Sequence, residues 1–344
     1  MTSVGKSLNI AIVGAGSIGC YLGGCLLSAS YNVTLIGRSR IQEQINTHGL
    51  KLTDWRERNE HIAAEQIHFS LALSDIKHAD YILVTVKSGN TEEVAREIAQ
   101  YAKPTAVVVS FQNGIHNANI LKQFLSQHHV LKAMVPFNVL SKDKAHFHCG
   151  TEGNLAIEDS NNVAGLLIDA LRKSKLPVDT YNDLSQLQWS KLLMNLNNSI
   201  NALSGLPLRE QLHDRHYRKI LALTIKEALQ VLKHAGIKPI KNGKVIPSLL
   251  PFILSLPDFL YKVIASSMLK IDPGARSSMY EDLSLGRPTE VDFINGEVVS
   301  LAQQYGVKSP INTAITLRVK EAEHAKNGSP NISANALYSL IMSQ

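Results

Sequence analysis

Residues 8–19 read LNIAIVGAGSIG, a short apolar run that passes directly into a glycine-rich turn. The run Leu8–Val13 is continuously apolar, as the buried strands of parallel sheets are. The stretch that follows the turn, Ser17–Ser28, is a helix candidate. The glycines recur as G-x-G-x-x-G at the point where the strand should end and the helix begin. We therefore expect a strand–turn–helix unit at the start of the chain.

Strand-like and helix-like segments continue to alternate up to about residue 180. The strand-like runs are Asn32–Ile36, Tyr81–Val86, Ala106–Phe111 and Val130–Val135, with helical candidates at Thr91–Tyr101 and Asn117–Gln127. This alternation is typical of βαβ units in a mostly parallel sheet. Beyond Tyr181 the strand signals stop and a helical period dominates. The helical stretches are Leu184–Leu203, Arg209–Ala235, Val291–Tyr305 and Ile311–Lys326.

These patterns predict an α/β fold with an N-terminal Rossmann-type doubly wound parallel sheet and an all-helical C-terminal domain. The 344 residues suffice for two domains, which commonly hold about 100–200 residues each. We place the boundary near Val178–Asp183. The two domains expected are residues 8–180, which would bind a nucleotide cofactor, and residues 181–344, which would carry substrate-binding and catalytic groups.

The composition is that of an ordinary globular protein, with 44% hydrophobic and 19% charged residues. A net charge of +6 favours anionic ligands, but the chain has no block of consecutive Lys and Arg residues. Aromatic residues make up only 6% and do not interleave with basic ones, so we expect no nucleic-acid partner. The apolar stretch Ile246–Ile271 contains three prolines and several charges, which disfavours a membrane span. We expect helix–loop structure there, packed on a core.

The cysteines Cys20, Cys25 and Cys149 have neither the spacing of a metal site nor the even number of a disulfide framework. No metal is expected, and a reducing cytoplasm fits best. The apolar run after Lys6 leads into the glycine turn without a cleavage-site pattern, so we expect no signal peptide. The sequence leaves the oligomeric state open, and a homodimer is compatible with it.

The glycine turn predicts a site for a dinucleotide. Gly14 permits the tight bend, Gly16 lets backbone N–H groups approach a pyrophosphate, and Gly19 allows close packing of helix on strand. The helix N-terminus then faces the phosphate charge. The residues expected to contact the cofactor here are Gly14, Ala15, Gly16, Ser17, Ile18 and Gly19.

The end of the second strand indicates which dinucleotide binds. NAD enzymes normally carry an acidic residue there, roughly 20 residues after the glycine motif, which accepts hydrogen bonds from the ribose. Here the strand ends in Gly37-Arg38-Ser39-Arg40, which contains two arginines and no acid. A guanidinium suits a 2′-phosphate, so we predict NADPH, with Arg38 as the phosphate ligand. The alternative is that both arginines are solvated surface residues.

Further candidates follow two later strands. Lys87 comes directly after the run Tyr81–Val86, and Asn113 follows Ala106–Phe111. Ligands of open α/β sheets bind beyond the carboxyl ends of the strands, so both residues are expected to contact cofactor or substrate. Each could also be an ordinary turn residue.

The helical domain offers a polar stripe on an otherwise apolar helix. Lys191, Asn195 and either Asn198 or Ser199 recur at a helical spacing and share one face. Buried polar groups need partners, and a ligand is one such partner. The alternative is a solvated face at the edge of the domain.

A second polar cluster lies in residues 276–296. Ser278 and Glu281 fit a capping box, and Thr289 could cap the next helix, whose first residue would be Glu290. Capping alone would explain these residues. However, a capped helix N-terminus also offers N–H groups to a substrate carboxylate.

Taken together, these motifs resemble those of the ketopantoate reductases (2-dehydropantoate 2-reductases) over nearly the whole chain. The motifs are GAGSIG, VTVKSGNT, FQNG, the W-x-K-L-x-x-N helix and RSSMYEDL…RPTEVDFINGEVV. The resemblance implies reduction of the 2-keto acid 2-dehydropantoate to pantoate with NADPH, a step toward pantothenate and coenzyme A.

The resemblance also implies roles for single residues. Lys191 matches the family's catalytic lysine, Glu290 its glutamate, which would hold the lysine or contact substrate or cofactor, and Asn113 the residue between nicotinamide and substrate. The implied substrate ligands are Asn113, Lys191, Asn195, Ser199 and Ser278. Two positions depart from the family's prototype, because Ser199 and Ala275 stand where it has asparagines, with Asn198 and Asn201 near the first.

Other activities fit the same motifs. One is reduction of another branched 2-keto acid, or of an imine as in opine dehydrogenases. Another is a non-catalytic NADPH-binding sensor, which would keep the glycine turn but would not need both Lys191 and Glu290.

Overall fold

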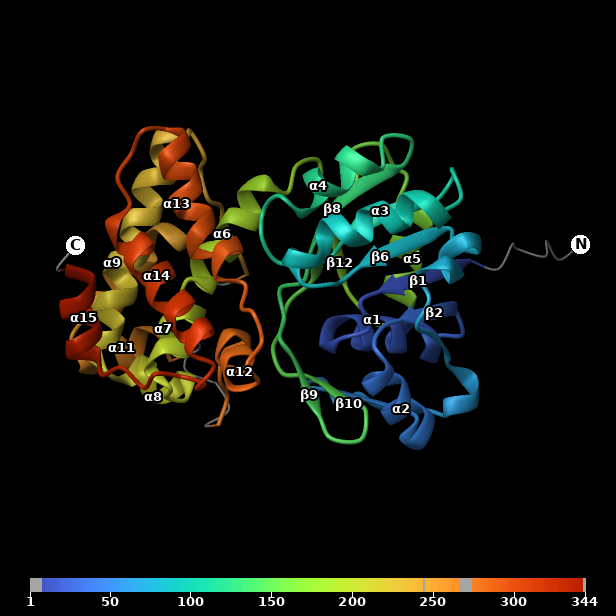
Figure 1. Cartoon of the computed structure of the whole chain (residues 1–344), viewed down its shortest axis with the longest axis horizontal. Coiled ribbons are helices and arrows are strands. Elements are labelled where there is room, and N and C mark those ends of the chain that lie inside the picture. The colour runs from blue at the N-terminus through green and yellow to red at the C-terminus, as the bar shows by residue number, and fades with distance from the viewer. Residues whose placement is uncertain (1–7, 244, 267–273, 343–344) are drawn as a thin grey trace, which may run out of the picture. The chain divides into compact units, whose positions relative to one another are not determined.

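The computed structural model describes residues 8–243, 245–266 and 274–342. The chain divides between Leu184 and Ser185 into two compact units. The first unit contains the strands and the second is built of helices (Figure 1). This confirms the predicted fold class.

The first unit is organised around an eight-stranded sheet in the order β12-β11-β8-β7-β6-β1-β2-β5. Neighbouring strands are parallel except β11, which runs antiparallel to β8. The predicted strands are confirmed, with ends that differ by at most two residues. The strands are β1 (Asn9–Val13), β2 (Asn32–Ile36), β5 (His68–Ser70), β6 (Tyr81–Val84), β7 (Val107–Ser110), β8 (His129–Met134), β11 (Leu155–Glu158) and β12 (Val178–Tyr181).

Helices cover both faces of this sheet, as Figure 1 shows. Alternate residues of β1 point to opposite faces, so Ile12 joins one buried cluster and Val13 the other. The cluster around Ile12 contains α1 and α5, and the cluster around Val13 contains η2, α3 and α4. The bounds of these elements are α1 (Ser17–Ser28), α5 (Gly165–Lys173), η2 (Leu73–His78), α3 (Thr91–Tyr101) and α4 (Asn117–Phe124).

A second, four-stranded sheet covers the outer side of α1, and the sequence patterns did not reveal it. Its order is β4-β3-β10-β9, where β3 pairs in parallel with a strand from much later in the chain. Helix α2 (Ser39–His48) leads into it. Its strands are β3 (Leu50–Asp54), β4 (Asn59–Ile62), β9 (Val139–Lys142) and β10 (His146–Cys149), and the short helices η1 (Ala64–Gln66) and η3 (Ser88–Asn90) complete the unit.

The second unit is helical, but three of the predicted long helices are interrupted. The stretch 184–203 forms α6 (Ser185–Asn195) and α7 (Asn197–Ser204), with the interruption in a run of asparagines, whose side chains compete for backbone hydrogen bonds. The stretch 209–235 is broken at Asp214, whose carboxylate accepts the N–H of His216 and caps the second helix. The stretch 291–305 forms a 3₁₀ turn followed by a helix.

The remaining helices of this unit are α8 (Leu208–His213), α9 (Arg215–His234), η4 (Pro247–Leu249), α10 (Leu250–Ser255), α11 (Asp258–Ile264), α12 (Ser278–Ser284), η5 (Val291–Phe293), α13 (Asn295–Gln304), α14 (Pro310–Ala325) and α15 (Ala334–Met342). Of these, α9 contacts α8, α10, α13, α14 and α15, whereas α12 packs against α7. The prediction for Ile311–Lys326 is confirmed by α14.

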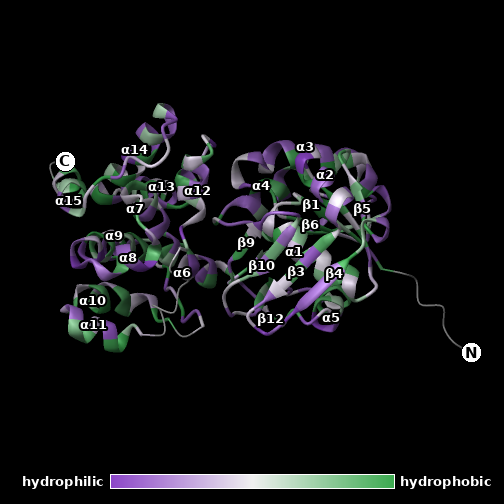
Figure 2. Ribbon diagram, turned by 90° about the horizontal axis from the view of Figure 1, so that it is seen from below, coloured by the Kyte–Doolittle hydropathy of each residue, from purple (hydrophilic) through white to green (hydrophobic). Residues whose placement is uncertain are grey.

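The apolar stretch that begins at Ile246 forms the short helices η4, α10 and α11, as far as the structure describes it, and its last residues, 267–271, lie outside the described part. Figure 2 shows many apolar residues on α10 and α11. The buried guanidinium of Arg218 attaches this segment to α9, because it donates to Leu256 O at 3.2 Å and to the Asp258 carboxylate at 2.6 Å. None of the described helices has the length and apolarity needed to span a bilayer.

Helix α1 lies very close to its neighbours on both sides. A Cβ atom on Gly23 would approach Ile12 Cγ1 of the main sheet to 3.1 Å. On Gly24 it would lie 2.7 Å from Leu50 Cδ2 of the small sheet. At Gly19 a Cβ atom would lie 2.7 Å from Thr85 Oγ1, a distance that packed side chains do not reach. Glycine therefore lets one helix fill the narrow space between two sheets.

We predict that Gly19→Ala lowers the free energy of unfolding by about 1–3 kcal/mol, because the added methyl group overpacks the space beside Thr85. Gly16→Ala is the control, since the nearest atom to its new Cβ would be 3.9 Å away. Urea denaturation followed by circular dichroism would measure both. Equal stability of the two variants would show that α1 can shift to accept the methyl group.

Candidate functional site

The glycine turn is fixed to the carboxyl ends of β2 and β6, the two strands that flank β1. Gly14 has a φ of +106°, and the N–H groups of Gly14 and Ala15 both donate to Ile36 O, at 2.9 and 2.8 Å. The Thr85 hydroxyl donates to Gly14 O at 2.8 Å. A Cβ on Gly14 would lie 2.6 Å from Val86 N, so the turn itself demands glycine at this position.

Gly16 is different, because no contact with the described residues requires glycine there. Its φ of −95° is ordinary, and a Cβ would have only Gly14 O nearby, at 3.9 Å. Gly16 is also the N-cap of α1, which has no side-chain cap and no acidic residue in its first turn. The space that a side chain would fill and the N–H groups at the start of α1 together fit a phosphate group. Gly14–Gly19 therefore form a site that suits the pyrophosphate of a dinucleotide.

Arg38 lies where the second strand passes into the next helix. It is the N-cap of α2, its side chain is exposed, and no acidic residue occurs in the first turn of that helix. Gly37 precedes it, and its N–H donates to Ser70 O at 3.1 Å. Arg40 is exposed as well. The region at the carboxyl end of β2 is therefore basic and accessible.

Lys87 and Asn113 lie in the loops after β6 and β7, two adjacent parallel strands. Lys87 is exposed and Asn113 is partly buried. The Ser88 hydroxyl donates to Asn113 O at 2.9 Å, so the two loops are joined directly. The structure thus brings these two predicted residues to one edge of the sheet.

A buried polar network fixes these loops, and the sequence analysis missed it. Asn117, at the first position of α4, donates through Nδ2 to Ser88 Oγ at 3.0 Å and to Asn113 O. Its Oδ1 lies 2.7 Å from the Thr91 hydroxyl, which can donate to it. Gln112 donates to Thr91 Oγ1 at 2.7 Å. Ser88, Thr91, Gln112 and Asn117 are each at most 7% exposed, so the network is shielded from water.

This network fixes the backbone of Asn113, because Ser88 and Asn117 both donate hydrogen bonds to its carbonyl oxygen. A fully satisfied network of buried polar groups is rigid, because breaking one bond leaves a buried group without its partner. Its sequence signal would have been the polar residues in two stretches next to strand ends, 88–91 and 112–117. Such residues look like ordinary turn formers until the tertiary contacts are known.

In the helical unit, Lys191 lies on α6 and is partly buried. Burial lowers the pKa of its ammonium group to about 8, and the nearby negative charge of Glu290 partly opposes this. Glu290 is also partly buried and precedes η5. The N-cap of η5 is Glu290 and not Thr289 as expected, but the Thr289 hydroxyl accepts the Val291 N–H at 3.1 Å and fixes the backbone on both sides of Glu290. An ammonium group with a pKa of about 8 can donate a proton near neutral pH.

Asn195, on the same face of α6, is partly buried, whereas Ser199 is fully buried in α7. The Ser199 hydroxyl donates to Asn295 Oδ1, and Asn295 in turn donates to Asn312. The break between α6 and α7 thus separates Ser199 from the polar face of α6. The hydrogen bond of Ser199 therefore lies inside the unit, and its role as a substrate ligand stays a prediction. Nearby Asn198 is partly exposed.

The cap of α12 is Ser277, not Ser278 as the sequence analysis expected. The Ser277 hydroxyl accepts the Tyr280 N–H at 3.2 Å and donates to Asn198 O at 3.1 Å. The side-chain oxygen of the fully buried Asn201 accepts the Ser277 N–H at 2.9 Å. Ser278 is the first residue of the helix and is exposed. Because Ser277 already caps the helix, the hydroxyl of Ser278 is not needed for that purpose.

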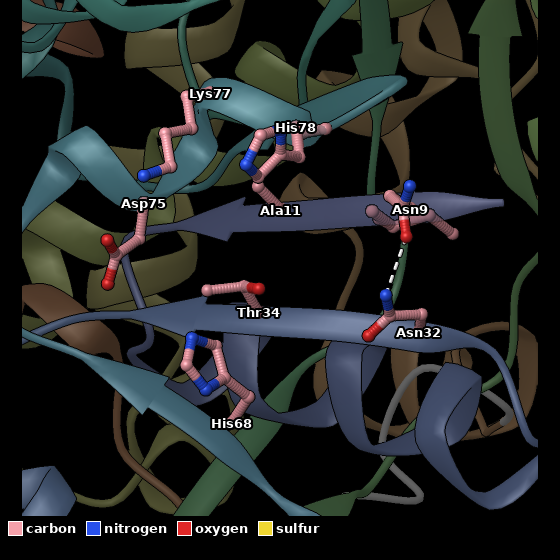
Figure 3. A pocket seen from close by; sticks show the side chains of 10 residues that line it. Asn9, Ala11, Asn32, Thr34, His68, Asp75, Lys77 and His78 are labelled. Atoms are coloured by element: carbon pink, nitrogen blue, oxygen red, sulfur yellow. Dashed lines mark hydrogen bonds between the residues drawn. The ribbon is translucent and has the colours of Figure 1, made fainter. Parts of the chain in front are cut away.

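A separate pocket of about 310 Å³ lies at the other ends of the strands (Figure 3). It is lined by Thr34, His68, Asp75 and Lys77 among others, and Asn32 Nδ2 donates to Asn9 Oδ1 at its edge at 2.6 Å. None of the predicted site residues lines it. It lies at the amino ends of β1 and β2, whereas ligands of such sheets bind at the carboxyl ends.

Comparisons with known proteins agree with this geometry. Residues 10–162 match the family model of the ketopantoate reductase PanE/ApbA, and residues 183–323 match the model of its C-terminal domain. A 2-dehydropantoate 2-reductase of Archaeoglobus fulgidus is 26% identical over 323 residues, 91% of this chain and 97% of the relative. One from Vibrio cholerae is 24% identical, over 92% of this chain and 99% of its own.

Solved structures give the same result for the fold. A PanE/ApbA family ketopantoate reductase from Ralstonia eutropha has a TM-score of 0.79 and 26% identity, over 93% of this chain and 99% of its own. A D-mandelate dehydrogenase, bound to NADH and anilino(oxo)acetate, has a TM-score of 0.74 at 21% identity, over 93% of this chain and all of its own. The two family models cover most of the chain, and both halves carry the expected folds. The chain therefore belongs to the ketopantoate reductase PanE/ApbA family of oxidoreductases.

Proposed function

We propose that this protein reduces 2-dehydropantoate to (R)-pantoate with NADPH. The observation that carries the proposal is the lysine on the polar face of α6, Lys191, whose pKa burial lowers to about 8 while the charge of Glu290 opposes the shift. The curated relatives from Archaeoglobus fulgidus and Vibrio cholerae, which match nearly the whole chain, are 2-dehydropantoate 2-reductases. A non-catalytic NADPH sensor would not need this lysine–carboxylate pair.

In this proposal residues 8–180 form the NADP-binding domain and residues 181–344 the substrate and catalytic domain. The N–H groups of the turn Gly14–Gly19 hold the pyrophosphate, and the Arg38 guanidinium binds the 2′-phosphate. Lys87 is a further cofactor contact. When bound, the cofactor supplies the hydride.

Lys191 acts on the oxygen of the substrate's keto group. Its ammonium stabilises the negative charge that develops there and donates the proton that completes the alcohol. Glu290 favours the charged form of the lysine and holds it in place, and it also contacts substrate or cofactor. Because burial lowers the pKa of Lys191 to about 8, the group is mostly protonated at pH 7 yet gives up its proton readily.

The remaining residues orient the substrate. Asn113 lies between nicotinamide and substrate, fixed by the buried network behind it. Asn195 and Ser278 bind the substrate, and Ser278 is placed to hold the carboxylate. Ser199 supports this arrangement from inside the unit, through its hydrogen bond to Asn295.

A second candidate is a reductase of another 2-keto acid. The likeness to a D-mandelate dehydrogenase favours it, because that enzyme of the same fold was solved with anilino(oxo)acetate, a different 2-oxo acid. The reaction would be of the same type and would use the same lysine. Substrate specificity separates the two candidates.

We predict that Lys191→Ala lowers kcat by about 10²- to 10⁴-fold, the usual effect of losing a general acid. NADPH affinity should stay within twofold, since the phosphates bind to the other domain. Lys226→Ala, at an exposed position of α9, is the control and should leave kcat unchanged. Near-normal kcat in a folded Lys191→Ala protein would eliminate the lysine as proton donor.

The pH profile of kcat gives a second test. The acid form of Lys191 is lost as pH rises through its pKa, so kcat for reduction should fall above about pH 8. Glu290→Gln removes the charge that raises this pKa and should move the alkaline limb to lower pH. An alkaline limb at the same pH in both proteins would contradict the coupling of the two groups.

We predict that Arg38→Ala raises the Michaelis constant for NADPH by about 10- to 100-fold, the range of a lost charge-assisted hydrogen bond. The constant for NADH should stay nearly unchanged, because NADH lacks the 2′-phosphate. Arg40→Ala is the matched control in the same turn. Steady-state kinetics with both cofactors measures the effect, and an equal loss with both would mean that Arg38 has a structural role only.

We expect purified protein to turn over 2-dehydropantoate with a kcat/KM at least tenfold above that for pyruvate or unbranched 2-keto acids, in line with the usual effect of matched apolar contacts. The decrease in NADPH absorbance gives the rates. Efficient reduction of another keto acid, together with no reduction of 2-dehydropantoate, would favour the second candidate.

A further inference from the structure

Gln188 on α6 is a buried polar residue, and its side-chain oxygen lacks a hydrogen bond to any described residue. Its side chain is 8% exposed. Its amide oxygen Oε1 is buried and, among the described residues, has no hydrogen-bond partner. Buried polar atoms in native proteins nearly always have a partner, so an unpartnered one marks a position where a group of a bound ligand can supply the missing hydrogen bond.

The position of Gln188 on the helix indicates where that group comes from. Gln188, Lys191 and Asn195 stand at i, i+3 and i+7 of α6 and therefore share one face. The opposite side carries Trp189 and Leu193, which are buried in the apolar core. Gln188 thus extends the polar stripe of α6 by one turn towards the start of the helix.

The other buried polar atoms that lack a partner among the described residues lie outside α6. The Nε atoms of Arg58 and Arg318 belong to guanidinium groups that form ion pairs through another nitrogen. The Tyr261 ring lies against the guanidinium of a buried arginine, and His128 lies in a loop of the first unit. Gln188 is the member of this set that shares a helix face with the proposed proton donor.

An amide oxygen is a hydrogen-bond acceptor, so its partner must be a donor. The keto and carboxylate groups of a 2-keto acid are acceptors and cannot fill this role. The proposed substrate, 2-dehydropantoate, also carries a primary hydroxyl group at the end away from the carboxylate. That hydroxyl is the donor that the substrate can offer to Gln188 Oε1.

We propose that Gln188 is a specificity-determining residue that accepts a hydrogen bond from the substrate's hydroxyl group. The inference rests on the proposed function and deepens it. It means that the site selects branched 2-keto acids with a hydroxyl group over those that lack one. A site with a buried acceptor discriminates against a ligand without the donor, because the acceptor then stays unpartnered.

The test compares 2-dehydropantoate with trimethylpyruvate, which has the same branched skeleton but lacks the hydroxyl oxygen. The ratio of their kcat/KM values is the preference to be measured. In Gln188→Leu this preference should fall by about 3- to 15-fold, the range of one neutral hydrogen bond. The fall should arise from 2-dehydropantoate alone, and the NADPH dissociation constant should stay the same.

Two further variants complete the test. Gln186→Leu makes the same chemical change at an exposed position two residues earlier in α6 and should leave the preference intact. Gln188→Glu keeps an acceptor oxygen at the same length and should retain the preference, even where the added charge alters kcat for both substrates alike.

The outcomes separate the inference from the proposed function. If unmodified protein fails to reduce 2-dehydropantoate, the proposed function is overturned, and so is the hydrogen bond between Gln188 and the hydroxyl group of that substrate. If unmodified protein prefers 2-dehydropantoate and Gln188→Leu keeps the full preference, only the assignment of Gln188 is overturned. Weaker NADPH binding by Gln188→Leu would also overturn it, because the amide would then contact the nicotinamide carboxamide.

Discussion

The first unit depends on how closely α1 packs between two sheets. Side-chain atoms of Ile12 on one side and Leu50 on the other leave no room for Cβ atoms at Gly23 and Gly24. At Gly19 the helix is as close to Thr85, whose hydroxyl also holds the glycine turn. This close packing sets the direction of the helix N-terminus. The proposed phosphate site is therefore a consequence of packing. Of the three glycines in the motif, only Gly16 is not required by contacts within the described chain, so its missing side chain leaves space for the ligand.

Close packing fixes the position of α1, and buried hydrogen-bond networks fix the positions of the loops. In the first unit, Asn117 and Thr91 join the loops after β6 and β7 and hold Asn113. In the second unit a similar chain runs from Ser199 through Asn295 and Asn312 to the Glu227 carboxylate. Each member of these networks constrains the next, since an unpaired buried group is costly. The residues proposed to contact substrate are in this way supported by residues that do not touch it.

The chemistry proposed for the helical unit arises from a balance between burial and charge. Burial disfavours the ammonium form of Lys191, while the Glu290 carboxylate favours it. An exposed lysine would hold its proton more firmly, and a buried lysine without the carboxylate would lose it more readily. The pair leaves the pKa at about 8, in the range where a general acid is effective.

The sequence by itself determined the elements whose signals are local. The apolar run Asn9–Val13, the glycine turn and the helix Ser17–Ser28 follow one another without a gap, so periodicity and turn chemistry suffice to predict them. The motifs around Lys191 and Glu290 were likewise visible, through their resemblance to a known family. Local patterns of apolar residues also predicted the parallel sheet and the helical second half.

Only the tertiary structure decided the features that depend on distant residues. The small sheet pairs β3 with β10, and residues so far apart in the sequence leave no local sign of pairing. Ser277 caps α12 and is joined to Asn201 and Asn198, and the buried Ser199 hydroxyl donates to Asn295. The unmet hydrogen bond of Gln188 is visible only once its surroundings are known. Local propensity fixes helices and strands, but burial and hydrogen-bond partners belong to the folded chain.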